Sequence, residues 1–346
     1  MVIQLGVLAP LTKPGWDEAG RHLLAGMELA VRDVNAAGGI QLELVVRDTA
    51  AETEKAVAAV DELAGLGVAA LVGEYHSVVA RAAATRADAL GVPFLCSSAV
   101  LDELTEQPTD WVARLCPPQS RGWQLYADYL LKAGHTRIAV VVAPSIYWTA
   151  GIRILRNDLA PRGGAIIELD TLTPSVVCDE LAGNGATALL LLTGHPEPAV
   201  PTVQAVRRDD RLAGILIGAP AGQPEFAEWG ALLGDEGTAI PFLRYLPEQL
   251  TPLGTRVKAS LSEAPSFVAF EGYDAITVLA SVLRTHGPDR TRIAESWQHV
   301  DVEGTRGRIH FTRTPEIPVW QWPSPPIQIA DRSPTDPSQF RTLHTN

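Results

Sequence analysis

The chain has 346 residues, of which 46% are hydrophobic and 20% are charged, and its formal net charge is −12 at pH 7. This length exceeds the size at which a single hydrophobic core stops growing, so we expect two domains. The acidic balance argues against a nucleic-acid-binding surface, and no apolar stretch approaches the roughly 20 residues that a membrane span needs.

The start of the chain predicts a strand, a loop and a helix. An apolar run over residues 3–9 is followed by a polar loop that contains Thr12 and Trp16, and an amphipathic helix then runs from about Asp17 to Gly38. In open parallel α/β sheets, ligands bind at loops that follow the carboxyl ends of strands. This loop lacks the glycine spacing that wraps a phosphate. Its hydroxyl, backbone and indole groups suit a small organic solute instead.

The alternation of apolar strands and helices continues to residue 217. Short apolar runs between helical patterns are typical of parallel sheets that are buried on both faces. After residue 110 the pattern begins again, and because Pro117 and Pro118 cannot continue a central strand, we expect the chain to cross to a second lobe there. A second crossing is expected at residues 240–246. The further strands expected in this part of the chain are residues 42–48, 68–73, 92–97, 111–115, 137–142, 165–169, 188–192 and 214–217.

The sequence thus predicts two α/β lobes and a short tail. A helix expected at residues 266–284 follows the second crossing, and the proline-rich end from about Gly304 has strand-like runs. We assign these segments to different lobes. The first lobe is expected to contain residues 2–117 and 247–300, the second residues 118–243 and 301–332, and residues 333–346 are expected to form a surface tail.

No motif in the chain indicates catalysis or a cofactor. The motifs of serine hydrolases, zinc metalloproteases and P-loop proteins are missing from the sequence, and the histidines lack metal-ligand spacing. Two Gly-x-Gly-x-x-Ala matches, at residues 65–70 and 183–188, run from helix to strand, whereas a dinucleotide site needs strand to helix. Cys96, Cys116 and Cys178 form no Cys-x-x-Cys pair and are expected to be small buried hydrophobic residues. We therefore expect no cofactor, no metal and no enzymatic activity.

Seven segments, in this order, resemble one protein family. They are GVLAPLT (6–12), GMELAVRDVNAAGGI (26–40), VRDTAAETEKAVAAV (46–60), ALVGEYHS (70–77), GVPFLCSSAV (91–100), RIAVVVAPSIYWTAG (137–151) and GYDAITVLASVL (272–283). Each segment alone is unspecific, but their common order across about residues 3–315 is specific. The family is the type I solute-binding proteins of branched-chain amino-acid ABC transporters, the Leu/Ile/Val-binding group.

This resemblance implies two Rossmann-like lobes with parallel sheets, joined by three crossing strands, which is the type I periplasmic binding protein fold. It also implies non-catalytic binding of a small organic solute, amino-acid-like or related, in a cleft between lobes that close by hinge motion. The expected partners are this ligand and an ABC-transporter permease.

The alternative function is that of a cytosolic ligand sensor of the same fold, similar to amide-sensing regulators, which the Tyr75-x-Ser77 loop favours. An enzyme built on this fold is a minor alternative. The family location is periplasmic. Residues 1–20 show no signal-peptide pattern, so the location stays open between the periplasm and the cytoplasm.

The resemblance also places candidate ligand contacts on loops that follow strands. Two loops of the first lobe match carboxylate-binding loops of the family, and in the second lobe one aromatic residue matches a side chain that closes over the ligand. We also expect two aromatic side chains to line the site: Trp16, in the loop after the first strand, and Phe270. The first-lobe candidates are Trp16, Tyr75, His76, Ser77, Ser97, Ser98, Ala99, Phe270 and Glu271, and the second-lobe candidates are Tyr147, Trp148, Gly194, His195 and Ala219.

Several of these residues have an alternative structural role. We expect Ser77 and Ser98, with nearby backbone N–H groups, to hold an anionic or carbonyl oxygen of the ligand. Ser77 could equally be a helix N-cap, and Ser97 and Ser98 could only form a turn. Trp148 and Tyr75 could belong to the hydrophobic core, and His76 could be an exposed loop residue.

One loop departs from the family pattern. Amino-acid binders of this family often place an acidic residue after the strand that corresponds to residues 214–217, where it binds the ligand ammonium. Here residues 218–222 read Gly-Ala-Pro-Ala-Gly, and burying an unpaired ammonium costs several kcal/mol. Either Glu74, Glu225 or Glu271 replaces that residue, or the ligand has no α-ammonium. In the second case leucine, isoleucine and valine bind weakly, and a less polar or aromatic solute binds better.

Overall fold

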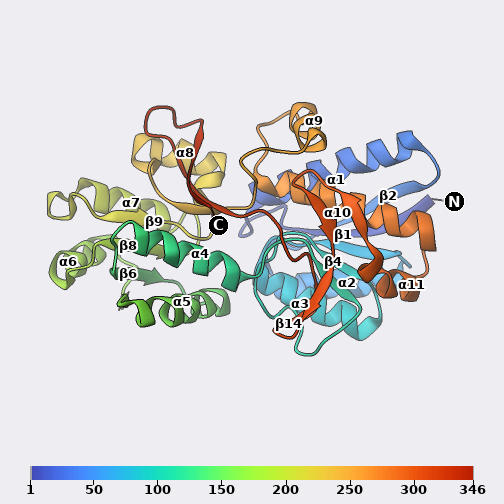
Figure 1. Ribbon diagram of the computed structural model, residues 1–346, viewed down its shortest axis with the longest axis horizontal. Helices are drawn as coiled ribbons and strands as arrows, with labels where there is room; N and C mark the ends of the chain where they lie inside the picture. Colours follow the sequence, from blue (N-terminus) through green and yellow to red (C-terminus); the bar gives the residue numbers. More distant parts are fainter. Residues whose placement is uncertain (1, 346) are drawn as a thin grey trace. The chain divides into compact units, whose positions relative to one another are not determined.

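The structure is a computed structural model that describes residues 2–345 and divides into two compact units (Figure 1). The first unit comprises the chain up to Pro118 together with Leu246–Pro326. The second comprises Gln119–Tyr245 together with the chain from Ile327 onward. The chain therefore passes between the units three times, and both units contain parallel sheets covered by helices. This confirms the predicted fold class.

The first unit is built on a seven-stranded sheet with the order β13-β14-β5-β4-β3-β1-β2. All neighbouring strands pair in parallel except the edge pair β13–β14. Its strands are β1 Val2–Ala9, β2 Gln41–Asp48, β3 Ala70–Gly73, β4 Phe94–Cys96, β5 Val112–Arg114, β13 Thr312–Thr314 and β14 Ile317–Gln321, and a small antiparallel pair is formed by β11 Asp301–Glu303 and β12 Arg308–His310. Its helices are α1 Asp17–Ala37, α2 Thr53–Gly65, α3 Ser77–Leu90, α9 Pro252–Ser260, α10 Phe267–His286 and α11 Arg290–Glu295.

The second unit contains a parallel sheet with the order β7-β6-β8-β9 and an antiparallel sheet with the order β10-β15-β16. The parallel strands are β6 Arg137–Val142, β7 Ala165–Leu169, β8 Ala188–Leu192 and β9 Leu216–Gly218. The antiparallel strands are β10 Phe242–Arg244, β15 Gln328–Arg332 and β16 Phe340–Thr345. The helices are α4 Gln119–Lys132, α5 Ile146–Leu159, α6 Pro174–Asn184, α7 Ala199–Arg208 and α8 Ala227–Leu233.

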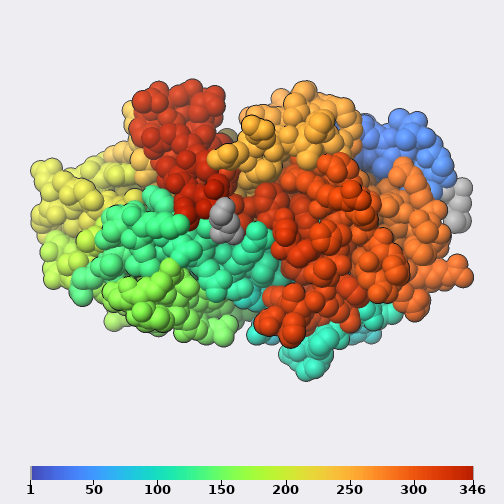
Figure 2. Space-filling model, in the orientation of Figure 1, coloured from blue at the N-terminus to red at the C-terminus, as the bar shows by residue number. Residues whose placement is uncertain are grey.

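Two sequence-based domain assignments are wrong. Residues 301–326 were expected in the second lobe but belong to the first unit, because β14 adds to the sheet in parallel with β5. Arg114 in β5 also donates through Nε to Oε1 of Gln321 in β14, at 2.7 Å. Residues 333–346 were expected to form a surface tail, but β16 within them pairs with β15. Figure 2 shows this C-terminal segment, in dark red, at the surface of the second unit.

Helices α1 and α10 lie side by side in the first unit (Figure 1). A Cβ atom at Gly26 in α1 would collide with the carbonyl oxygen of Ala269, and one at Gly272 in α10 would collide with that of Leu23. The absence of a side chain at both positions therefore lets the two backbones approach closely.

The three cysteines are buried and unbridged, as the sequence predicts. The thiols of Cys96 and Cys116 lie against the same carbonyl oxygen, that of Ala99, at 3.7 Å and 3.0 Å. Among the described residues, no helix has the length and apolar character needed to cross a membrane.

Candidate functional site

Three predicted site residues of the first unit form an aromatic cluster. Trp16 follows β1, and Tyr75 and His76 follow β3, so all three lie where parallel strands end at their carboxyl side. The rings of Trp16 and Tyr75 meet edge-on with centroids 5.7 Å apart, and those of Tyr75 and His76 at 5.3 Å. The backbone N–H of Trp16 donates to Nε2 of His76 at 3.1 Å. Burial lowers the pKa of His76 to about 4, so its ring is neutral near pH 7 and can accept this bond.

The side chain of Glu74 accepts hydrogen bonds that stabilise the loop between β3 and α3. Its buried carboxylate accepts the hydroxyl of Thr49 at 2.6 Å and the backbone N–H groups of Tyr75 and His76 at 2.7 and 2.8 Å. Burial raises the pKa of Glu74 to about 7, against the opposing effect of these hydrogen bonds. The carboxylate therefore bonds to its own loop and to Thr49 in the loop after β2, which argues against a role as ligand-ammonium partner.

Ser77 links this loop to the next one. It is the first residue of α3, whose N-cap is His76. Its Oγ accepts the backbone N–H groups of Val100 and Leu101 at 3.1 and 3.3 Å. A hydroxyl that accepts two bonds still has its own proton to donate. Ser77 thus stabilises the neighbouring loop and retains the chemistry to donate to a ligand oxygen.

The loop after β4 is almost fully buried. Ser97, Ser98 and Ala99 have exposed fractions of 0%, 5% and 0%. Oγ of Ser98 lies 3.1 Å from Oγ of Ser97, and the backbone N–H of Ser97 donates to the carbonyl of Gly73 at 2.9 Å. The loops after β3 and β4 are therefore directly joined, which places two of the predicted hydroxyl groups beside the Glu74 loop.

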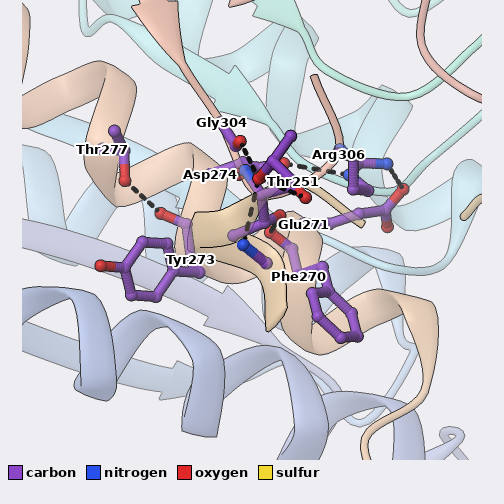
Figure 3. A network of polar contacts seen from close by, with 10 residues as sticks. Thr251, Phe270, Glu271, Tyr273, Asp274, Thr277, Gly304 and Arg306 are labelled. Atoms are coloured by element: carbon purple, nitrogen blue, oxygen red, sulfur yellow. Dashed lines mark hydrogen bonds and ion pairs between the residues drawn. The ribbon is translucent and has the colours of Figure 1, made fainter. Parts of the chain in front are cut away.

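Glu271 belongs to a buried ionic network in the first unit (Figure 3). Arg306 donates to Glu271 Oε1 and to Asp274 Oδ2, each at 3.0 Å, and Asp274 Oδ1 accepts the backbone N–H of Thr305 at 2.6 Å. Burial raises the pKa of Glu271 to about 7, opposed by Arg306 and by a hydrogen bond with Ser98. Phe270, next to Glu271 on α10, is only 1% exposed. Both side chains therefore lie inside the first unit, where Glu271 is paired with Arg306.

A second aromatic cluster lies in the second unit, at the start of α4 and α5. The ring centroid of Tyr147 is 4.7 Å from that of Trp148 and 6.1 Å from that of Trp123. Gln119 donates from Nε2 to the carbonyl of Tyr147 at 2.9 Å. Trp148 is 9% exposed, so most of its surface is covered, whereas Tyr147 is only half-buried.

The remaining predicted residues of the second unit lie after β8 and β9. Gly194 is exposed. The side chain of His195 is 0% exposed, its Nε2 lies 3.2 Å from Glu228 and its ring centroid lies 5.8 Å from that of Trp229. Ala219 is fully buried. His195 therefore belongs to the packing beneath this loop.

The structure adds two polar side chains that the sequence analysis did not name, Thr193 after β8 and Gln223 in the loop after β9. Gln223 donates from Nε2 to the carbonyl oxygen of Thr193 at 3.2 Å, and both residues are buried. Glu225 is paired with Arg244, whose Nε lies 2.7 Å from Glu225 Oε2. Thr193 directly follows the buried strand β8, which is the signal that could have identified it. Glu74, Glu225 and Glu271, the three carboxylates considered for a ligand ammonium, thus all have partners within their own units.

Comparisons with known proteins agree with this fold. The sequence profile of the family described as periplasmic binding protein matches residues 2–319. Leu/Ile/Val-binding protein homolog 7 of Brucella abortus is 31% identical and covers 89% of this chain and 84% of its own length. Homolog 3 of Brucella melitensis is 28% identical over 56% of this chain, and the match spans only about half of that relative, 55%.

Solved structures share the fold at low sequence identity. A leucine-binding protein of Thermotoga maritima has a TM-score of 0.82 at 19% identity, and the match covers 99% of this chain and 98% of that one. An ABC-transporter solute-binding protein of R. palustris, in complex with benzoate, has a TM-score of 0.83 at 16% identity, with 100% and 96% coverage. The family profile matches most of the chain, and homolog 7 of Brucella abortus matches over most of its own length. These matches confirm the predicted resemblance: this chain belongs to the periplasmic binding protein family.

Proposed function

We propose that this protein binds a small organic solute without altering it chemically and presents it to an ABC transporter. The family membership supports solute binding. The site supports it further, because hydroxyl groups, backbone N–H groups and aromatic rings gather on loops after parallel strands, where ligands of such folds bind. The proposed contacts are Trp16, Tyr75, His76, Ser77, Ser97 and Ser98 of the first unit and Tyr147 and Trp148 of the second.

We further propose that the solute carries no α-ammonium. The observation behind this proposal is that Glu74, Glu225 and Glu271 already bond to Thr49, Arg244 and Arg306. An ammonium that used Glu225 or Glu271 would have to share the carboxylate with Arg244 or Arg306, which would place a second positive charge beside a buried or half-buried guanidinium. The solute is expected to be an uncharged or anionic molecule.

Calorimetric titration with leucine and with 4-methylpentanoate tests this, since the two molecules share an isobutyl group and a carboxylate and differ in the ammonium. We expect the acid to bind more tightly. Micromolar leucine binding that is unaffected by Glu74→Gln, Glu225→Gln and Glu271→Gln would contradict the proposal. An NMR spectrum of the bound acid that stays unchanged after long incubation would support the absence of turnover, and new resonances would contradict it.

A further inference from the structure

The buried pair Thr193 and Gln223 makes fewer hydrogen bonds than its chemistry allows. Both side chains are nine-tenths or more buried, with exposed fractions of 2% and 0%. Within the described part of the chain, neither Thr193 Oγ1 nor Gln223 Oε1 has a hydrogen-bond partner. A buried polar atom that lacks a partner costs about 1–3 kcal/mol, so hydrogen bonds from another molecule to these two neighbouring atoms would be stabilising.

The carboxamide of Gln223 has a defined orientation. Its Nε2 donates to the backbone carbonyl of Thr193, and this bond fixes which end of the amide carries the oxygen. Oε1 is therefore the end that is available to another molecule. An amide oxygen accepts hydrogen bonds only, so its partner must supply an N–H or O–H group.

The backbone of the loop that contains Gln223 is fixed by hydrogen bonds from one arginine. Arg332 in β15 donates to the carbonyl oxygens of Pro224, Glu225 and Phe226, at 2.6, 3.3 and 2.8 Å. These bonds secure the backbone directly after Gln223. A polar group on a preorganised loop loses little entropy when it binds a ligand, which is what a specificity-determining position requires.

The charge of this region disfavours an ammonium as the missing donor. The carboxylate next to the pair, Glu225, lies against Arg244 and is 1% exposed. The pair itself is neutral. An ammonium placed here would be buried without a free counter-charge and beside a guanidinium, which is electrostatically unfavourable.

We propose that Thr193 and Gln223 form a subsite that accepts an uncharged hydrogen-bond donor of the solute, a hydroxyl or an amide N–H. This inference rests on the proposed function and names the class of solute more narrowly. Gln223 Oε1 accepts the donor hydrogen, and the Thr193 hydroxyl either donates to the same group or accepts a second hydrogen from it.

Two matched series of probes test the class of solute. The first is 4-methylpentanoate, 2-hydroxy-4-methylpentanoate, 4-methylpentanamide and leucine; the second is benzoate, 4-hydroxybenzoate and 4-(aminomethyl)benzoate. In at least one series, the hydroxyl or amide member is expected to bind about tenfold more tightly than the parent acid and the ammonium member, the effect of one good neutral hydrogen bond. Comparing the affinities of the hydroxyl and the amide probes shows which donor the subsite prefers.

Thr193→Val tests the residue itself. Its hydroxyl makes no bond within the described protein, so the variant is expected to keep or slightly raise the melting temperature while its affinity for the best hydroxyl or amide probe falls about tenfold. Thr202→Val is the matched control. Thr202 is also buried, but its hydroxyl donates to the carbonyl of Pro198 at 2.8 Å, so this variant should lose stability and keep the order of probe affinities.

Gln223→Glu adds a negative charge to the subsite and is expected to shift preference toward the ammonium probes, whereas Gln124→Glu, on the exposed face of α4, should not. Unchanged probe affinity in Thr193→Val, or tightest binding by an ammonium probe in wild type, would overturn the subsite, as would binding of none of the hydroxyl and amide probes at millimolar concentration. The proposed function would survive each of these results if native mass spectrometry still showed another small molecule bound to the protein.

Discussion

Glu74 and His76 lie in the same loop, and folding moves their pKa values in opposite directions. The pKa of Glu74 rises from 4.5 to about 7, so its contribution to stability is complete below pH 4.5 and is lost as the pH rises to 7. The pKa of His76 falls from 6.5 to about 4, so its contribution is present above pH 6.5 and is lost as the pH falls toward 4. Between pH 4.5 and 6.5 the two effects oppose each other.

Single substitutions are expected to separate these effects. Relative to wild type, the stability of Glu74→Gln should rise with pH between 4.5 and 7, and that of His76→Gln should fall as the pH rises from 4 to 6.5. Each change has a magnitude of order 3 kcal/mol, because each pKa moves by about 2.5 units. Urea denaturation at a series of pH values measures both. Glu271 shares the sign of Glu74 but is present in both variants, so parallel pH profiles for the two variants would contradict the assignment.

A second prediction for a single residue concerns the hydroxyl group of Ser77. Ser77→Ala leaves the backbone N–H groups of Val100 and Leu101 without their acceptor, so the free energy of unfolding should fall by about 1–3 kcal/mol even without ligand. Ser260→Ala is the control, because that hydroxyl is exposed and bonds only within its own helix. Equal stability of the two variants would show that Ser77 does not hold this loop.

The sequence predicted that Tyr75, His76 and Ser77 lie together, because all three follow one buried strand. It could not predict that the Ser77 hydroxyl bonds to residues 100–101, since that contact joins two strand-end loops that are distant in the chain. Nor could it show that Glu74 points back into its own loop, because carboxylates after strands are equally typical of ligand contacts.

At the scale of whole elements, the packing of α1 against α10 depends on two glycines. Gly26→Ala would drive a methyl group into the carbonyl oxygen of Ala269, so the helices must move apart, at a cost of about 3 kcal/mol or more. Gly65→Ala is the matched control, because a Cβ there meets nothing within 4 Å, and its stability should stay within about 1 kcal/mol of wild type. Thermal unfolding distinguishes the two, and similar melting temperatures would show that the close approach is not needed.

Strands with a strong apolar run, such as β1 and β8, agree closely with their sequence-based bounds. The places of β14 and β16 in their sheets were not predicted, for a physical reason. β14 is short and begins beside a proline, and its place in the sheet depends on pairing with β5, some two hundred residues earlier in the chain. β16, Phe-Arg-Thr-Leu-His-Thr, has a polar, half-exposed pattern that fits a tail as well as an edge strand. In both cases the decisive partner is distant in sequence.

For the whole molecule, the pairing of β10 with β15 suggests that the second unit can fold alone. Arg244 lies opposite Gln328 in this antiparallel pair, so Tyr245 and Ile327 can be joined by an Asn-Gly turn of the kind that closes hairpins. The fused chain 119–245 plus 327–345 is expected to unfold cooperatively in circular dichroism. The control is residues 119–245 alone, which lack β15, β16 and the Arg332 bonds to the Gln223 loop. A fused chain that is as unfolded as this control would contradict the prediction.

The burial of all three native thiols has a practical consequence for spectroscopy. Cys96, Cys116 and Cys178 are 0%, 0% and 4% exposed, so a maleimide dye should react with the folded protein slowly or not at all. A cysteine introduced at the exposed Gln124 would then be the single labelling point, and no native cysteine would need to be replaced. A fluorophore attached there would let solute binding be followed in real time by changes in emission, with the unmodified protein serving as its own blank.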